Sequence, residues 1–333
     1  MAEKLIKNLP RLKFAHLPTA VEALPHLSAE LGGPRLLVKR DDQTGLAFGG
    51  NKTRKLEFLL AEAQANGARM LITAGALQSN HCRQTAAAAA RNGFACTLVL
   101  SLPPGQSEAP PQAQEGSGNL LLDRLLGAHI IWTSRELRSQ VLEETFQDAW
   151  DAGQRPYLIP YGGSNPTGAV AYAFAMEELL LQGVKPDWIV FASSSGGTQS
   201  GLVLGAQMFN YRGKVLGISV DEPADVLKAR VAKLATETAD LLGGDLEFKA
   251  EEIMVNADYL GGGYGVMGEP EIEAINLFAQ KEGLFLDPVY TGRAAAGLLD
   301  LIRRGFFKHN DIVLFWHTGG APALFADSYQ GMF

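Results

Sequence analysis

The sequence has few cysteines, no long hydrophobic run and no dense cluster of positive charge. Its 333 residues include only Cys82 and Cys96, too few for a disulfide framework and without the ligand spacing of a zinc site. No run reaches the roughly 18 apolar residues of a membrane span. The stretch from Met1 to Lys7 lacks the apolar core of a signal peptide. We therefore expect a cytoplasmic protein with no membrane association and no metal.

The formal net charge is −7 and the basic residues are scattered. This arrangement does not form the positive face that nucleic-acid binding requires. With 47% hydrophobic residues, a chain of this length can bury a large core and is long enough for two domains. The default expectation is an enzyme that acts on a small molecule.

Short apolar segments alternate with segments of helical periodicity along most of the chain, which is typical of α/β proteins with a mostly parallel sheet. The clearest loop is the stretch from Pro103 to Pro111, which is rich in proline and poor in apolar residues. The predicted strands are 69–73, 96–102, 128–132, 156–160, 188–192, 215–220 and 312–316.

The segment Gly49-Gly50-Asn51-Lys52 precedes a predicted helix whose buried face carries Leu56, Leu59, Leu60 and Ala63. Asn51 suits an N-cap, so Lys52 falls in the first turn. There the helix dipole and the cations Arg54 and Lys55 all disfavour an ammonium, which favours a nucleophilic amine. The alternative interpretation is a solvated basic turn.

A second segment, Ser193 to Gly201, follows a predicted strand and opens a predicted helix. Gly196 and Gly197 allow backbone amides to converge on a phosphate, and Ser195 and Thr198 add hydroxyl donors. The segment lacks the Lys-Ser/Thr ending of a nucleoside-triphosphate loop. It therefore predicts an anion site without a magnesium nucleotide.

A third segment, Gln78-Ser79-Asn80, also stands at a predicted helix start, where free amides and polar side chains form a carboxylate clamp. Simple N-capping by Ser79 or Asn80 is the structural alternative. His81 is interpreted as a local hydrogen-bonding residue and Cys82 as a packing residue.

The stretch from Gly263 to Gly268 matches the dinucleotide fingerprint G-x-G-x-x-G, so NAD binding has to be weighed. The fingerprint belongs directly after a strand, whereas polar residues intervene here and Glu269 places an acid where pyrophosphate would bind. We interpret this loop as a device that presents Tyr264 to a ligand.

Two further segments lie near the C-terminal end. Tyr290 and Thr291 stand in Asp-Pro-Val-Tyr-Thr-Gly, before a predicted helix from Arg293 to Ile302. Thr318 follows a predicted strand and precedes Gly319-Gly320, at an edge against which a flat ring can lie.

Taken together and in this order, these segments resemble the D-cysteine desulfhydrase and 1-aminocyclopropane-1-carboxylate (ACC) deaminase group of fold type II pyridoxal-phosphate enzymes. The resemblance extends from Phe14 to Phe325. It implies an α/β fold of two open, twisted, mostly parallel domains with the cofactor in the cleft between them. The implied large domain comprises residues 1–52 and 166–333, and the implied small domain residues 53–165. The resemblance also implies a homodimer.

The resemblance assigns roles to the residues of these segments. It implies that Lys52 holds pyridoxal phosphate as a Schiff base, that Asn80 lies near the ring hydroxyl and that Thr318 offers a neutral hydrogen bond at the pyridine nitrogen. The implied phosphate-binding residues are Ser195, Gly196, Gly197 and Thr198. The implied substrate-binding residues are Gln78, Ser79, Asn80 and Tyr290.

Within this group, ACC deaminases carry glutamate after the tyrosine of Asp-Pro-Val-Tyr and leucine after the final histidine. Thr291 and Thr318 stand there instead, which is the desulfhydrase-like pair. The expected reaction is β-elimination on D-cysteine, giving pyruvate, hydrogen sulfide and ammonia. Lys52 is the expected base at Cα, Ser79 binds the substrate carboxylate, and Tyr264 or Tyr290 assists the leaving thiolate.

Other functions stay open at this point. L-cysteate sulfo-lyase uses the same elimination but needs a cation or several hydrogen-bond donors for the sulfonate, for which Arg83 and His81 are the nearest candidates. The phosphate loop is more serine-rich, and Tyr161 is bulkier, than is usual for desulfhydrases. The two threonines argue against ACC deaminase, and the intact clamp and tyrosines argue against a non-catalytic pyridoxal-phosphate-binding protein.

Overall fold

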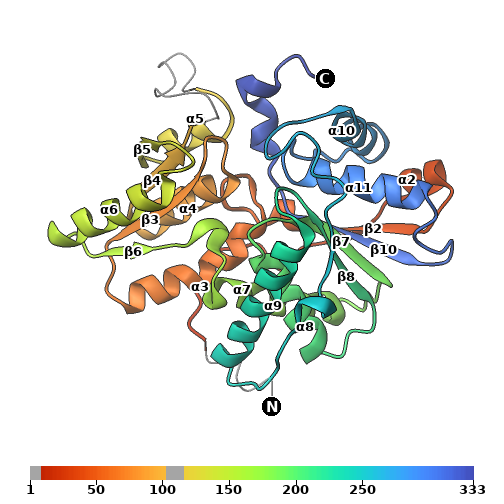
Figure 1. The fold of residues 1–333 in the computed structure, drawn as a ribbon, viewed down its shortest axis with the longest axis horizontal. Helices are drawn as coiled ribbons and strands as arrows, with labels where there is room; N and C mark the ends of the chain where they lie inside the picture. The colour runs from red at the N-terminus through yellow and green to blue at the C-terminus, as the bar shows by residue number, and fades with distance from the viewer. Residues whose placement is uncertain (1–8, 103–115) are drawn as a thin grey trace.

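The computed structural model describes residues 9–102 and 116–333. The predicted loop from Pro103 to Pro111 and the segment from Met1 to Lys7 lie outside the described residues. Two sheets form the molecule (Figure 1), one with the strand order β1-β2-β10-β7-β8-β9 and the other with the order β5-β4-β3-β6. The fold is therefore the predicted pair of α/β sheets.

The six-stranded sheet draws its strands from both ends of the chain. β2 pairs with β10 in parallel, and only the edge pair β1–β2 is antiparallel among the described strands. The chain thus returns to its first sheet after building the second. The strands are β1 Val21–Ala23, β2 Arg35–Arg40, β7 Trp188–Ser193, β8 Lys214–Ser219, β9 Met254–Asn256 and β10 Ile312–His317.

The four-stranded sheet is parallel throughout. Its strands are β3 Met70–Ala76, β4 Ala95–Ser101, β5 His129–Thr133 and β6 Pro156–Leu158. The seven predicted strands are all present. Three further strands were not predicted: β1 and β9 are only three residues long, and β2 has a short apolar centre between basic residues.

Helices cover both faces of the six-stranded sheet (Figure 1), because alternate side chains of each strand point to opposite sides. In β7, Val190 packs with α2, α10 and α11, whereas Ile189 packs with α7, α8 and α9. The helices are α2 Pro25–Leu31, α3 Asn51–Ala65, α4 Asn80–Asn92, α5 Gly118–Leu125, α6 Arg138–Asp151, α7 Pro166–Leu181, α8 Gly197–Met208, α9 Ala224–Leu241, α10 Glu269–Glu282 and α11 Thr291–Arg303.

A buried carboxylate, Asp41, fixes α3 against the six-stranded sheet. Arg54 of α3 donates to it from Nε at 2.9 Å and from Nη2 at 2.7 Å. The Tyr172 hydroxyl and the Trp316 indole donate to it at 2.6 and 2.8 Å. Burial alone would raise the pKa of Asp41, but the Arg54 guanidinium and these donors hold that pKa below its ordinary value. The carboxylate is therefore charged, and α3 cannot shift without unpairing it.

We expect Asp41→Ala to lower the free energy of unfolding by about 3–5 kcal/mol, because it leaves the buried Arg54 guanidinium without its main partner. Chemical denaturation monitored by circular dichroism measures the loss. Glu273→Ala, which breaks a half-exposed ion pair with Arg303, is the control and is expected to cost about 0–1 kcal/mol. Equal losses in the two variants would contradict the prediction.

Candidate active site

A pocket lies where the carboxyl ends of strands from both sheets face one another. Its lining includes Lys52 from the first turn of α3, Ser79 to His81 after β3, Ser193 to Gly196 after β7, and Thr318 after β10. Open α/β sheets bind ligands at this edge. The residues predicted from separate motifs are thus brought together in one place.

The start of α3 differs from the prediction in one respect. The helix begins at Asn51 and its N-cap is Gly50, not Asn51. Gly50 has a φ of +127°, and a Cβ there would lie 2.6 Å from the Gln84 side chain, so the position requires glycine. The side-chain amide of Asn51 instead donates from Nδ2 to the Thr198 hydroxyl at 3.0 Å, which joins the start of α3 to the start of α8.

The pKa of Lys52 is lowered to about 8, as its position suggested, but the cause differs. Burial is the main effect, and it is partly opposed by the nearby Asp287 carboxylate. Arg54 was expected to contribute, yet its charge is paired with Asp41 and Glu178. A substantial fraction of Lys52 is therefore a neutral amine near pH 8.

The segment between β7 and α8 has the form of a phosphate cradle. Gly196 caps α8 with a φ of +87°, and the Gly197 amide donates to the Ser164 hydroxyl at 3.2 Å. The hydroxyls of Ser164 and Ser195 lie 2.7 Å apart. A Cβ at Gly197 would lie 2.6 Å from Ser164 Oγ. Small residues are therefore required where the backbone amides of the helix start converge.

Lys55 also belongs to this cradle, although its role was not predicted. Its amino group donates to the Gly162 carbonyl at 3.1 Å and to Ser164 Oγ at 3.5 Å. A Cβ at Gly197 would lie 2.9 Å from Lys55 Nζ. Burial, followed by repulsion from Lys52, lowers the pKa of Lys55 well below its ordinary value. The i, i+3 spacing from Lys52 was the available signal, since it places both lysines on one face of the helix.

The start of α4 combines the two interpretations offered for it. Ser79 is the N-cap and its hydroxyl accepts from the Cys82 amide at 3.2 Å, which confirms the capping role. The hydroxyl hydrogen remains available to a ligand. The amides of Asn80 and His81 have no acceptor among the described residues, as is usual in the first turn of a helix. Together these groups can hold a carboxylate.

His81 lines the pocket as a neutral ring. The Thr73 hydroxyl gives its hydrogen to the Ile159 carbonyl at 2.8 Å, so it must accept from His81 Nε2 at 2.9 Å. The pKa of His81 is well below its ordinary value because of burial and then of Lys52 and Lys55. His81 is therefore a neutral hydrogen-bonding residue, as interpreted from the sequence.

Tyr264 and Tyr290 meet at the side of the pocket. Their hydroxyls are 2.6 Å apart, and their rings are nearly perpendicular with centroids 5.8 Å apart. Burial raises the pKa of both phenols well above the ordinary value. Both are thus protonated at neutral pH, and the pair can donate a proton but is a poor base.

Asp287 explains the position of Tyr290. Its Oδ2 accepts from the amides of Val289 and Tyr290 at 3.2 and 3.1 Å. Its Oδ1 accepts from the Thr291 amide and hydroxyl at 2.6 and 2.8 Å. The carboxylate therefore folds the turn that begins α11, and the Thr291 hydroxyl is occupied in that turn.

Thr318 is the other threonine that separates desulfhydrases from ACC deaminases in the resemblance. It lines the pocket, and its backbone carbonyl accepts from the backbone N–H of Asn51 at 3.0 Å. Of the two threonines, then, Thr318 faces the pocket, whereas Thr291 acts within the protein.

A larger cavity of about 630 Å³ adjoins the pocket and shares Tyr161, Ser194 and Ser195 with it. Gln78 and Tyr264 line this cavity. The Gln78 side chain accepts from the Asn119 amide at 2.7 Å and donates to the Ser117 carbonyl at 3.2 Å. Its predicted contact with substrate stays a prediction.

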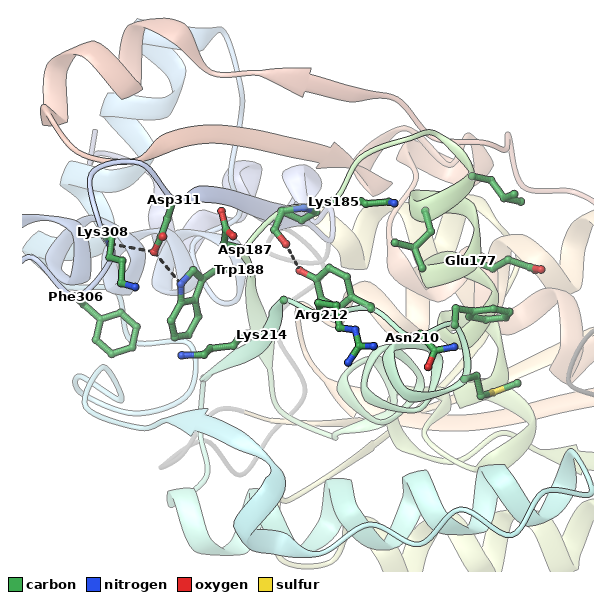
Figure 2. Close-up of a pocket in the computed structure, with 17 residues that line it drawn as sticks. Glu177, Lys185, Asp187, Trp188, Asn210, Arg212, Lys214, Phe306, Lys308 and Asp311 are labelled. Carbon is green, nitrogen blue, oxygen red and sulfur yellow. Dashed lines mark hydrogen bonds between the residues drawn. The ribbon is translucent and has the colours of Figure 1, made fainter.

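Another hollow, of about 930 Å³, lies at the opposite edge of the six-stranded sheet (Figure 2). It is formed where β7, β8 and β10 begin, next to Trp188, Lys214 and Asp311. The predicted site residues lie at the other ends of these strands, so this hollow is separate from the candidate active site.

The dinucleotide-like loop does not follow a strand directly. β9 ends at Asn256, twelve residues before Gly268, and the Gly268 amide at the start of α10 donates to Glu271 at 2.9 Å. Arg293 holds the loop by donating to the carbonyls of Gly263 and Val266 at 2.9 and 2.6 Å. The loop thus presents Tyr264 and leaves no free helix start for pyrophosphate.

The described residues contain no group of three or more histidine, cysteine, aspartate or glutamate side chains placed to hold a metal ion. Among the same residues, no helix is both long and apolar enough to cross a membrane.

A half-buried, partly neutral lysine between two α/β sheets, beside a small-residue phosphate cradle, defines a pyridoxal-phosphate site. A family model described as pyridoxal-phosphate dependent enzyme matches residues 12–319, and the chain belongs to this family. The residues fit the phosphate group of the cofactor. The cradle has no room for a Cβ at Gly197, and the Lys55 amino group lies beside this glycine.

Curated relatives and solved structures agree with this class. The chain is 42% identical over 330 residues to proteins named D-cysteine desulfhydrase from two Klebsiella pneumoniae strains, 342 and ATCC 700721, covering 98% of this chain and of each relative. A structure titled as an ACC deaminase homologue matches with a TM-score of 0.89 and 37% identity over 100% of this chain and 99% of that one. A pyridoxal-phosphate-dependent aspartate racemase shares the fold, with a TM-score of 0.65 and 18% identity over 91% of this chain and 90% of that one.

The lowered pKa of Lys52 can be measured in the protein freed of cofactor. We expect competitive acetylation with trace acetic anhydride, read by mass spectrometry, to show reactivity at Lys52 that rises with pH and levels off above about pH 8. The sign follows because only the neutral amine reacts, and its fraction grows until the pH passes the pKa. The exposed Lys185 is the internal reference, and a shared midpoint for the two lysines would contradict the prediction.

Proposed function

We propose that this protein is a D-cysteine desulfhydrase, which converts D-cysteine and water to pyruvate, hydrogen sulfide and ammonia. The observation that carries the proposal is the convergence of Lys52, Ser79 and Tyr290 in one pocket. These three residues supply an amine, a carboxylate-binding group and a proton donor. The name shared by the full-length curated relatives supports the same activity.

In this proposal Lys52 attaches pyridoxal phosphate, which when bound withdraws electrons from the substrate α-carbon. Asn80 contacts the ring hydroxyl and Thr318 the ring nitrogen. The phosphate is held by Ser195, Gly196, Gly197 and Thr198, with the Lys55 amino group beside them. Lys55 is an addition to the set predicted from the sequence.

The substrate carboxylate is held at the start of α4. The Ser79 hydroxyl and the free amides of Asn80 and His81 are its donors, and Gln78 lies on the adjoining side. Fixing the carboxylate orients the Cα–H bond toward Lys52. Once the substrate amine has displaced Lys52 from the cofactor, the freed lysine takes this proton, and its pKa of about 8 makes it an effective base near neutral pH.

The leaving sulfur is protonated by the tyrosine pair. Tyr290 lines the pocket and its hydroxyl is hydrogen-bonded to that of Tyr264. A proton given by Tyr290 can be replaced from Tyr264, so the two phenols act as one acid. Because burial keeps both protonated, the pair is suited to release a thiol and not to abstract a proton.

Two related activities fit the site less well. A sulfonate would need a cation or several hydrogen-bond donors, but the Arg83 guanidinium already donates to Asn80, Asn119 and the Gly49 carbonyl. His81 is neutral, so neither candidate is free for L-cysteate. Thr291 stands where the resemblance places the glutamate of ACC deaminases, so this position offers no carboxylate for the stronger electron withdrawal that opening a cyclopropane ring requires.

The proposal also includes features that were expected from the sequence and from the family resemblance. These are a homodimer working in the cytoplasm, a large domain of residues 1–52 and 166–333, and a small domain of residues 53–165 that closes on the substrate.

The central test is a pyruvate and sulfide assay of the purified protein on D-cysteine, L-cysteate and ACC, with Lys52→Ala alongside. We expect both products from D-cysteine, and loss of activity and of the visible cofactor absorbance in the variant. Pyruvate from L-cysteate without turnover of D-cysteine would replace the proposed substrate. Cofactor absorbance without turnover of any amino acid would indicate a binding protein.

The tyrosine pair is tested by comparing leaving groups. We expect Tyr290→Phe to lower kcat on D-cysteine by about 100-fold or more, because it removes the general acid. Tyr264→Phe should have a smaller effect, since Tyr264 reaches the pocket through Tyr290. β-Chloro-D-alanine is the control, because chloride leaves without a proton. An equal loss on both substrates would show that the tyrosines position the substrate and do not protonate sulfur.

A further inference from the structure

The side-chain amide of Asn80 has only one possible orientation. Its oxygen accepts from Arg83 Nη1 at 2.9 Å and from Asn119 Nδ2 at 2.9 Å. A guanidinium has donors only, so the Asn80 atom that faces it must be the oxygen. An amide oxygen has two lone pairs, and these two bonds use both of them.

The Asn80 NH₂ group is consequently directed to the other side. Asn80 lines the cofactor pocket, and within the described ranges its Nδ2 has no protein acceptor. A Cβ at Gly320 would lie 2.7 Å from this nitrogen, so the chain after β10 passes close to it. The Asn80 NH₂ group thus presents hydrogen-bond donors to the pocket, and the ligand atom that binds there must be an acceptor.

Arg83 and Asn119 are themselves held by further bonds. Arg83 Nη1 also donates to Asn119 Oδ1 at 2.5 Å, and its Nη2 donates to the Gly49 carbonyl at 3.0 Å. Asn119 donates from its amide and its side chain to Gln78 at 2.7 and 2.9 Å. Both residues are fully buried. One closed network therefore joins the segment before Lys52, the start of α4 and the start of α5.

We propose that Arg83 and Asn119 are positioning residues that hold the Asn80 amide with its N–H groups toward the ring hydroxyl of bound pyridoxal phosphate. The inference rests on the ring contact assigned to Asn80 above. Neither Arg83 nor Asn119 lines the pocket, so both act through Asn80. The charge of Arg83 on the amide oxygen also polarises the amide, which makes its N–H groups stronger donors.

Asn119→Asp tests this orientation with almost no change in size. The new carboxylate accepts only, so it removes one of the two donors that hold the Asn80 oxygen and repels that oxygen, which displaces the amide from its wild-type orientation. We expect the dissociation constant for pyridoxal phosphate to rise about 10- to 100-fold, the usual effect of losing a hydrogen bond to a charged group. Titration of the cofactor-free protein, followed by visible absorbance, measures the constant. Asn92→Asp, at the opposite end of α4 from Asn80, is the matched control.

A double-mutant cycle with Asn80→Ala separates positioning from general structure. If Asn119 acts through Asn80, the double variant binds pyridoxal phosphate no more weakly than Asn80→Ala alone. Additive losses, or an Asn119→Asp constant within twofold of the wild type, would overturn the proposal. Should Asn119→Asp fail to fold, Asn119→Ala enters the same cycle with the same limits and an expected rise of about 3- to 10-fold. Arg83→Lys, which keeps a charged donor, is expected to bind the cofactor better than Arg83→Gln.

The cofactor titration requires no substrate. A wild-type protein that binds pyridoxal phosphate but releases no sulfide from D-cysteine would refute the proposed activity and leave the positioning result readable. Tight binding by Asn119→Asp together with normal sulfide release would refute the positioning role alone.

Discussion

The buried pair of Asp41 and Arg54 is the constraint on which the site depends. Arg54 lies on α3 two residues after Lys52, and its guanidinium reaches a carboxylate that is also held by residues of α7 and β10. A charge pair of this kind tolerates little displacement, because any shift leaves an unpaired ion in the core. The direction in which Lys52 faces the cleft is therefore set by an interaction that makes no contact with substrate.

Burial accounts for the chemistry of the site in two opposite ways. For the Lys52 amine it disfavours the charged form and lowers the pKa to about 8. For Tyr264 and Tyr290 it also disfavours the charged form, which here raises the pKa of the phenols. One physical effect thus produces both a base and an acid in the same cleft. Neighbouring charges adjust the result but do not determine its sign.

Most of the fold and much of the site could be predicted from the sequence, because both depend on local patterns. Apolar runs identified seven strands, and small residues after a strand identified the phosphate cradle. The short strands β1 and β9 were not predicted, since a strand of three residues shows no clear periodicity. The N-cap of α3 was misassigned because the Asn51 side chain donates a hydrogen bond to Thr198, a residue 147 positions away. The position of Lys55 in the phosphate cradle and the bond from Arg83 to Asn119 were not predicted, since both follow from tertiary contacts.

The position of β10 also determines when the protein can become functional. This strand lies between β2 and β7 in the six-stranded sheet, yet it is synthesised after both of them. A growing chain that lacks residues 312–317 has its large sheet divided into two pieces, and it lacks the pocket wall formed by Thr318. The cofactor can therefore be captured only after β10 has been synthesised and has joined β2 to β7.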